Sequence, residues 1–277
     1  MKHLDTHAQI KRFQIKPKKS LGQNFLVEPA GLNKVLMAAQ LEGNEQVLEI
    51  GAGLGSLTVL LAQSAREVIA VEIDKTLFPA LQDATQAYPN VRNIQGDILE
   101  CNLNELIGNG PFVVVANIPY YITSAIIRHL LEAHKRPNRM ILTIQKEVAD
   151  RIVARDGKMS LLSLSVQVYA DAERFGIIPA GAFYPAPDVD SAVLRLNLHE
   201  KPLIDEANLE SFFKLAHAGF SQKRKTLRNS LSSGLNKPAN EVEILLDKAH
   251  IEASRRAETL TLNEWKTLVS VFVDSVI

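Results

Sequence analysis

The segment Gln46–Gln63 constrains the fold of this chain more than any other part of it. It passes from five mostly apolar residues, Gln46–Ile50, through the loop Gly51-Ala52-Gly53-Leu54-Gly55 into Ser56–Gln63, whose composition is helical. A strand, a glycine-rich loop and a helix in this order are typical of the nucleotide-binding opening of a doubly wound α/β fold. A glycine-rich loop alone is also compatible with an ordinary turn, so this interpretation needs support from the rest of the chain.

The spacing of the glycines narrows the choice of ligand. A dinucleotide fingerprint would need a glycine where Ser56 stands. Gly51 and Gly53 let a ligand approach the backbone closely because they lack a Cβ atom. Glu49 precedes them, and a carboxylate there disfavours a pyrophosphate and favours a ligand with a cationic end. We therefore predict that Glu49, Gly51 and Gly53 belong to a cofactor site.

Polar residues stand at the ends of four predicted strands. They are Glu49, Glu72, Asp97 and Asn117, at or near the carboxyl ends of successive strands. In open α/β sheets that edge is where ligands bind. Glu72 lies 21 residues beyond Gly51, where such folds place the acid that binds ribose hydroxyls. Four such residues in register predict a binding site rather than solvated surface.

The fourth strand, Phe112–Ala116, runs into Asn117-Ile118-Pro119-Tyr120. Pro119 fixes its own φ, donates no N–H and biases the preceding residue towards extended geometry, so the chain leaves the sheet as a stiff loop. Asn117 offers a neutral acceptor oxygen, and Tyr120 offers a flat aromatic face. This pair suits a planar group that bears an amino substituent, such as adenine.

A second aromatic residue stands before a stiff loop. Phe183 precedes Pro185 and Pro187, which limit the conformations of the chain there. The loop either presents Phe183 to a ligand or uses it as a buried anchor, and the residues alone leave both readings open.

Composition and length fit a globular chain with two domains. At 277 residues, with 46% hydrophobic and 22% charged residues, it can hold one large and one small domain. We predict a first domain over 1–200, of which 1–20 form a basic tail. After about Lys201 the pattern is wholly helical, with helices predicted over 206–219, 222–233, 240–249 and 263–275, so we predict an all-helical domain over 201–277.

The same sequence argues against several classes of protein. The polar, basic start does not read as a signal peptide, and no apolar run reaches the roughly eighteen residues that a membrane span needs. Cys101 is the only cysteine, which excludes an internal disulfide and a cysteine-based zinc site and fits a reducing cytosol. We therefore expect a cytoplasmic protein with no membrane and no metal.

Basic residues are clustered although the net charge is zero. Neither residues 11–19 nor residues 214–229 contain an acid. Local clusters on a neutral chain indicate an anionic ligand that is bound locally, whereas a solvated tail or helix face is the alternative. In the second cluster, on the helix predicted over 222–233, the candidates are Lys223, Arg224, Lys225 and Arg228.

Together these motifs identify a family. The chain resembles, almost end to end, the KsgA-type small-subunit rRNA adenine dimethyltransferases. The resemblance rests on Gln23-Asn24-Phe25-Leu26, Glu49-Ile50-Gly51-Ala52-Gly53, Asn117-Ile118-Pro119-Tyr120, Gln145-Lys146-Glu147-Val148, Phe183-Tyr184-Pro185-Ala186-Pro187 and Phe220–Asn229. One departure concerns local loop geometry, because Met159-Ser160-Leu161-Leu162-Ser163 stands where relatives often have Tyr-Gly-x-Leu-Ser.

The resemblance implies a Rossmann-like, seven-stranded sheet that binds S-adenosylmethionine (SAM), its last strand antiparallel, with a small helical C-terminal domain that binds RNA. It implies transfer of two methyl groups to each of two adjacent adenosines near the 3′ end of the small-subunit (16S) rRNA, in a precursor of the 30S subunit, by a monomer. In the target site Asn117 and a carbonyl near Ile118 would accept the amino hydrogens, and Tyr120 and Phe183 would sandwich the base. The SAM site would be lined by Asn24, Leu26, Gly51, Glu72, Asp97 and Asn117.

Two alternatives stay open. The related large-subunit (23S) rRNA adenine dimethyltransferases that confer antibiotic resistance share the Asn-x-Pro-Tyr loop, but the basic segment Gln222–Asn229 favours the small-subunit type. A non-catalytic ribosome assembly factor could keep the fold. Intact Glu72, Asp97 and Asn117 argue against that alternative, since a pure binder need not keep a cofactor site.

Overall fold

The chain divides into two compact units. The computed structural model describes residues 3–108, 110–155 and 157–275. We call the first unit, Met1–Ala149 with Ala172–Leu198, the sheet unit. We call the second unit, Asp150–Asp171 with His199–Ile277, the helical unit.

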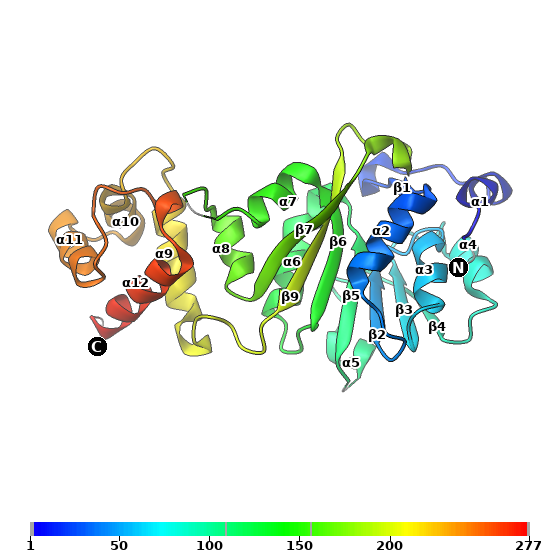
Figure 1. The fold of residues 1–277 in the computed structure, drawn as a ribbon, viewed down its shortest axis with the longest axis horizontal. Helices are drawn as coiled ribbons and strands as arrows, with labels where there is room; N and C mark the ends of the chain where they lie inside the picture. Colours follow the sequence, from blue (N-terminus) through cyan, green and yellow to red (C-terminus); the bar gives the residue numbers. More distant parts are fainter. Residues whose placement is uncertain (1–2, 109, 156, 276–277) are drawn as a thin grey trace. The chain divides into compact units, whose positions relative to one another are not determined.

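A seven-stranded sheet in the order β4-β3-β2-β5-β6-β9-β7 forms the centre of the sheet unit (Figure 1). Strands β2 to β6 pair in parallel, whereas β9 is antiparallel to β6. The α/β class and the antiparallel last strand predicted from the sequence are confirmed. The strands are β2 Gln46–Ile50, β3 Glu67–Glu72, β4 Val91–Gln95, β5 Phe112–Asn117, β6 Arg139–Gln145, β7 Ala170–Ile178 and β9 Ser191–Leu198.

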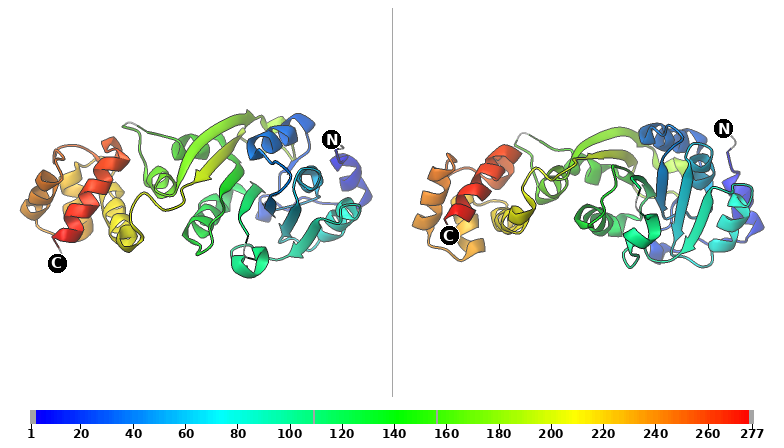
Figure 2. Two further views of the ribbon diagram at one scale, coloured as in Figure 1. Left: turned by 60° about the horizontal axis from the view of Figure 1, so that its bottom comes forward. Right: turned by 90° about the horizontal axis from the view of Figure 1, so that it is seen from below.

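Helices cover both faces of this sheet, which is why its central strands are mostly apolar. Val47, Val68 and Val113 form one buried cluster with residues of α2 and α3. Figures 1 and 2 show α6 on the opposite side of the sheet from α2. The helices of this unit are α1 Thr6–Arg12, α2 Pro29–Ala39, α3 Ser56–Ala62, α4 Phe78–Thr85, α5 Leu103–Ile107 and α6 Thr123–Glu132, with α7 Lys146–Ile152 leading into the helical unit.

A small two-stranded sheet ties the N-terminal segment to the loop before β9. β1, Phe25–Leu26, pairs antiparallel with β8, Phe183–Tyr184, so that Leu26 lies opposite Phe183. The chain also forms short 3₁₀ helices, which are η1 Lys19–Leu21, η2 Tyr120–Ile122, η3 Ala180–Ala182, η4 Glu206–Asn208 and η5 Ala257–Thr259.

The helical unit is organised around α9. α9 contacts α8, α10 and α12, and the largest fully buried side chains of the unit include Phe212 and Trp265. Phe220, the last residue of α9, stacks on Trp265 with ring centroids 5.9 Å apart. The helices are α8 Leu161–Gln167, α9 Leu209–Phe220, α10 Leu227–Leu235, α11 Ala239–Lys248 and α12 Leu262–Asp274.

The predicted domain boundary at residue 200 needs one correction. The helical unit also contains Asp150–Asp171, which the sequence analysis assigns to the first domain. The physical reason is hydrogen bonding between distant segments. The Met159 N–H donates to the Glu258 carbonyl over 3.1 Å, and the Leu203 N–H donates to the Val168 carbonyl over 2.8 Å. These long-range bonds are invisible to a boundary search based on composition.

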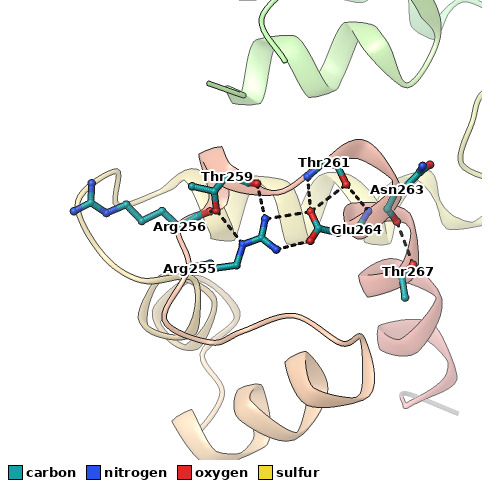
Figure 3. A network of polar contacts seen from close by, with 7 residues as sticks. All are labelled: Arg255, Arg256, Thr259, Thr261, Asn263, Glu264 and Thr267. Atoms are coloured by element: carbon teal, nitrogen blue, oxygen red, sulfur yellow. Dashed lines mark hydrogen bonds and ion pairs between the residues drawn. The ribbon is translucent and has the colours of Figure 1, made fainter. Parts of the chain in front are cut away.

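An ion-pair network fixes the loop between α11 and α12 (Figure 3). The Arg255 guanidinium pairs with the Glu264 carboxylate and donates to Thr259, as Figure 3 shows. Glu264 also accepts from the Thr261 N–H over 2.7 Å, in the capping box that starts α12. The Arg255 carbonyl accepts from the Leu227 N–H over 2.6 Å, so the start of α10 is held to the same loop.

Ser160, the departure from the family pattern, caps α8. Its φ is −135°, so the position needs no glycine. Its hydroxyl accepts from the Ser163 N–H over 3.1 Å, and the Ser163 hydroxyl accepts from the Ser160 N–H over 2.6 Å. The two serines therefore form a reciprocal cap that glycine cannot supply.

We expect Ser160→Ala to lower the free energy of unfolding by about 1 kcal/mol and Ser160→Gly by only a few tenths, because glycine tolerates the cap position better than alanine does. Urea denaturation of the full chain measures both values. Ser165→Ala, within the same helix, is the matched control and should be nearly neutral. Equal stability of Ser160→Ala and the wild type would show that the cap is not stabilising.

Candidate functional site

A cavity of about 280 Å³ lies at the carboxyl ends of β2, β3, β4 and β5, entirely within the sheet unit. Parallel strands bring residues from distant parts of the chain to this edge. Of the residues predicted to bind a cofactor or to act on a target, those that line the cavity are Asn24, Gly51, Gly53, Glu72, Asp97, Asn117, Pro119, Tyr120 and Phe183.

The glycine loop exposes backbone to this cavity. Gly51 has φ +73° and Gly53 has φ +57°, a backbone conformation that side-chain-bearing residues rarely adopt. A Cβ atom on Gly53 would lie 3.3 Å from the Phe25 ring, and one on Gly51 would lie 3.4 Å from the Asn117 carbonyl oxygen. The loop therefore needs both glycines where it faces the cavity.

Glu72 is a buried carboxylate that organises this loop. Its Oε2 accepts from the Gly53 N–H over 2.7 Å, and its Oε1 accepts from the Asp74 N–H over 2.8 Å. Burial raises the pKa of Glu72, and the two backbone donors oppose that rise. A carboxylate has about four lone-pair sites, so each oxygen can still accept from a ligand hydroxyl.

Asn117 is held by its amide nitrogen. Nδ2 donates to the Asn24 carbonyl over 2.9 Å, which aims the two halves of the amide in fixed directions. Within the described part of the chain no donor reaches Oδ1, so this oxygen is available as an acceptor. Ile118 continues the strand by donating its N–H to the Thr143 carbonyl over 3.2 Å.

Tyr120 and Phe183 are among the aromatic residues that line the same cavity as Asn117. The Tyr120 hydroxyl lies 2.8 Å from the Ser191 hydroxyl, which fixes the half-buried ring. Burial raises the pKa of Tyr120, with a smaller opposing effect from the Ser191 hydrogen bond. Phe183 is 4% exposed, belongs to the core cluster and also lines the cavity, so it is a buried anchor that is available to a ligand on one side.

Hydrogen bonds that the sequence does not predict hold the N-terminal segment at this cavity. We call the contacts of Asp74 with Lys18 and Gln23 the polar clamp. Buried Asp74 accepts from Lys18 Nζ over 2.7 Å and from Gln23 Nε2 over 2.8 Å. Burial would raise the pKa of Asp74, but the hydrogen bonds from Lys18, Thr76 and Gln23 outweigh burial and lower the pKa to about 2. No local pattern links positions 18 and 74, so the sequence offers no signal for the clamp.

Two predicted cofactor residues do not line the cavity. Leu26 is 5% exposed and packs in the core cluster, and its neighbour Phe25 lines the cavity instead. The reason is that successive strand residues point to opposite sides. Glu49 is 1% exposed and is also absent from the lining, so the structure does not bring it to the surface of the cavity that the other predicted residues line.

Glu49 is instead a buried acid on β2, two residues before Gly51 of the glycine loop. Burial raises the pKa of Glu49 to about 8, Thr58 lowers it, and the nearby Glu72 raises it further. Its Oε2 has no hydrogen-bond partner among the described residues. At neutral pH the carboxyl is therefore mostly protonated.

The basic residues of the helical unit lie on a turn rather than on a helix. The helix predicted over 222–233 begins only at Leu227, and the residues before it form a turn in which the Lys225 N–H bonds back to the Gln222 carbonyl over 3.0 Å. Lys223, Arg224 and Lys225 are exposed on this turn. Arg228 alone is on α10, and it pairs with Glu243 over 2.6 Å, so its charge is already balanced.

The residues around the cavity fit a bound SAM molecule. Glu72 and Asp97 offer acceptors for ribose hydroxyls and an amino group, and apolar side chains such as Ile73 and Ile98 offer surface for a purine ring. The glycine backbone leaves room that a Cβ atom would fill. Among the described residues no group of three or more His, Cys, Asp and Glu side chains could hold a metal ion. No described helix is long and apolar enough to cross a membrane.

Comparison with known proteins decides the family. The model of the ribosomal RNA adenine dimethylase family matches residues 14–269. The chain belongs to the ribosomal RNA adenine dimethylase family. Other members share much of its sequence. The ribosomal RNA small subunit methyltransferase A of Dehalococcoides mccartyi is 46% identical over 264 residues, which cover 95% of this chain and 91% of that protein. The protein of the same name from Lachnoclostridium phytofermentans is 40% identical, covering 95% and 93%.

Solved structures agree with the adenine dimethylase fold. A dimethyladenosine transferase from Plasmodium falciparum has a TM-score of 0.77 at 26% identity, covering 91% of this chain and 98% of that chain. The 23S rRNA methyltransferase ErmE has a TM-score of 0.73 at 30% identity, covering 90% and 99%. The fold is thus shared by a 23S rRNA methyltransferase and a dimethyladenosine transferase, and it does not by itself choose the substrate.

Proposed function

We propose that this chain uses SAM to transfer two methyl groups to the 6-amino group of each of two adjacent adenosines near the 3′ end of small-subunit (16S) rRNA. The observation that carries the proposal is Asn117, which lines the cavity with Nδ2 bound to Asn24 and Oδ1 left as an acceptor. Family membership and the 46% identity to a small-subunit methyltransferase support the choice of substrate. Such an enzyme acts on ribosome precursors in the cytoplasm, and we expect it to be a monomer.

The chemistry depends on making the amino group nucleophilic. SAM supplies a methyl group on a sulfonium, a good leaving group. The 6-amino lone pair of adenine is delocalised into the ring and attacks poorly. Asn117 Oδ1 and the Ile118 carbonyl would accept both amino hydrogens, which localises the lone pair and orients it for attack. Because the acceptors are neutral, they tolerate the positive charge that develops on nitrogen, and the resulting ammonium is acidic enough to lose its proton to water.

The aromatic rings would hold the base after it leaves its stack. Tyr120, fixed through Ser191, and Phe183, fixed in the core, would lie on its two sides. Stacking is worth roughly 1–3 kcal/mol per base, which can offset an unstacking cost of a few kcal/mol. Pro119 keeps the intervening loop stiff, so little order is lost when the base binds.

The remaining residues would bind cofactor and RNA. Glu72 would accept from the ribose hydroxyls of SAM and Asp97 from its adenine amino group, while Asn24, Gly51 and Gly53 would approach it closely. The exposed cations Lys223, Arg224 and Lys225 would contact RNA phosphates. Arg228, already paired with Glu243, would contribute least.

The cofactor assignment predicts that Glu72→Ala weakens binding of S-adenosylhomocysteine by roughly 2–3 kcal/mol, because two hydroxyls lose a buried charged acceptor. It should also lower the melting temperature, since Gly53 and Asp74 lose their backbone acceptor. Titration calorimetry measures the affinity. Glu67→Ala, at the other end of β3, is the matched control and should bind normally. Unchanged affinity in a folded Glu72→Ala chain would remove Glu72 from the site.

A further inference from the structure

The helical unit contains a second cavity, of about 450 Å³, that the proposed chemistry does not use. All of its lining residues belong to the helical unit. Its volume lies within the roughly 300–1,000 Å³ of small-molecule sites. We infer that this cavity holds a single nucleotide of the RNA substrate, with the phosphate at a cationic rim and the base against an apolar floor. The inference rests on the proposed function and extends it.

The rim carries an excess of positive charge without balancing partners. Arg151, Lys223 and Lys225 line the cavity, with His217 beside them. No described acid pairs with any of these four side chains, in contrast to Arg228, whose partner Glu243 lies 2.6 Å away. Unpaired cations around one hollow attract an anion, and the ribose-phosphate backbone is the anion that the proposed substrate offers.

The floor is apolar and aromatic. It includes Met159 and Ala257, both at most 6% exposed, and Phe220, which is stacked on Trp265. A base could lie against Phe220 as an additional layer of that stack. Glu258 is the one acid among the lining residues, and its carboxylate can accept from an exocyclic amino group or a ring N–H of a base. An apolar floor would not contribute to the binding of a phosphate ion alone, whereas it would contribute to the binding of a base.

The walls are fixed before any ligand binds. The Met159 N–H donates to the Glu258 carbonyl over 3.1 Å, which joins two walls. The turn that carries Lys223 and Lys225 is held at one end by the Ser221 hydroxyl, which donates to the Ala218 carbonyl over 2.7 Å. At the other end the Leu227 N–H bonds to the Arg255 carbonyl, which the network in Figure 3 fixes. A preformed site loses less entropy on binding than a flexible turn does.

The turn itself provides a charge-matched test. Lys223 and Lys225 line the cavity, whereas Arg224, between them, does not. We expect Lys223→Ala and Lys225→Ala each to weaken binding to unmethylated small subunits about tenfold and to lower the slope of log affinity against log salt by about 1. Arg224→Ala should lose clearly less. Equal losses in all three variants would mean general electrostatic attraction and would overturn the inference.

Blocking the cavity without changing charge gives an independent test. Ser221→Trp places a ring at a lining residue, and Ser254→Trp places one at an exposed residue outside the lining. Only Ser221→Trp should weaken subunit binding, by tenfold or more, while the chain stays folded and its S-adenosylhomocysteine affinity is unchanged. Normal subunit binding by folded Ser221→Trp would overturn the inference.

A direct probe separates this inference from the proposed function. With S-adenosylhomocysteine saturating the first cavity, adenosine 5′-monophosphate should shift the His217 imidazole resonances of the full chain, more strongly than inorganic phosphate does. Ser221→Trp should abolish the shift. An unmoved His217 signal in an enzyme that methylates small subunits would contradict the nucleotide site alone. If the wild type neither binds nor methylates small subunits, the proposed function itself fails.

Discussion

Asn117→Ala should reduce methyl transfer about a hundredfold or more while S-adenosylhomocysteine affinity falls much less. The variant removes Oδ1, which would accept an amino hydrogen of the target in the transition state, and one such acceptor is worth on the order of 3 kcal/mol. It also leaves the Asn24 carbonyl without its donor, 2.9 Å away in the wild type. Single-turnover methyl transfer and calorimetry on the same preparation separate the two effects.

The control for Asn117→Ala is another asparagine of the same sheet. Asn197 lies on β9, is exposed and does not line the cavity. Asn197→Ala should therefore transfer methyl groups at the wild-type rate. Near-normal turnover by Asn117→Ala would exclude Asn117 as an acceptor of the amino hydrogens. The Ile118 carbonyl would then be the one proposed acceptor that remains.

Glu49→Gln should change how the stability of the cofactor-free chain depends on pH. The folded-state pKa of Glu49 is raised from 4.5 to about 8, chiefly by burial. A raised pKa means that the folded chain holds this proton more tightly than the unfolded chain does. Its contribution to stability is therefore fully present below about pH 4.5 and is lost as the pH rises through about 8.

The size of this effect is large for one residue. At 1.36 kcal/mol per pKa unit, the loss over the whole window is on the order of 5 kcal/mol. Glutamine is isosteric and does not titrate, so Glu49→Gln should be more stable than the wild type at pH 9 and should show a shallower decline. Urea denaturation between pH 5 and 9 measures this, with Glu67→Gln on β3 as the control. Parallel pH profiles for the wild type and Glu49→Gln would show that the buried carboxyl is not held neutral.

The sheet could be predicted from the sequence because its pattern is local. Gln46–Ile50 is a strand with the bounds predicted for it, and the strand predicted over Phe112–Ala116 is observed as Phe112–Asn117. Each is a short segment whose non-polar residues pack against neighbouring elements. The pattern of non-polar residues within the segment is therefore enough to predict a strand. The gathering of Glu72, Asp97 and Asn117 at one edge follows from parallel pairing, which the alternation of strands and helices already implies.

What could not be predicted depends on partners far away in the sequence. Phe25 rather than Leu26 faces the cavity because β1 pairs with β8, which a motif does not reveal. The helix predicted over 222–233 starts late because the Leu227 N–H is bound by the Arg255 carbonyl. Lys18 bonds to Asp74 across 56 positions, and neither residue carries a local sign of it.

Asp74 also shows how a reasonable local rule is overridden. The sequence places it before a stretch of helical composition, where it would suit a helix cap. In the structure Asp74 instead accepts from the Thr76 N–H over 2.9 Å, and α4 begins only at Phe78. Asp74 therefore accepts hydrogen bonds from Lys18 and Gln23 in the polar clamp and does not cap α4.

Methyl transfer from labelled SAM to ribosomal subunits that lack these methyl groups tests the central claim most directly. Purified small and large subunits should be offered separately to the wild type and to Asn117→Ala, and the labelled nucleotides should be mapped. We predict label only on small subunits, with two methyl groups on each of two adjacent adenosines near the 3′ end of the rRNA, and little label with Asn117→Ala. Label on the large-subunit rRNA, or no transfer to either subunit by a chain that binds S-adenosylhomocysteine, would contradict this account.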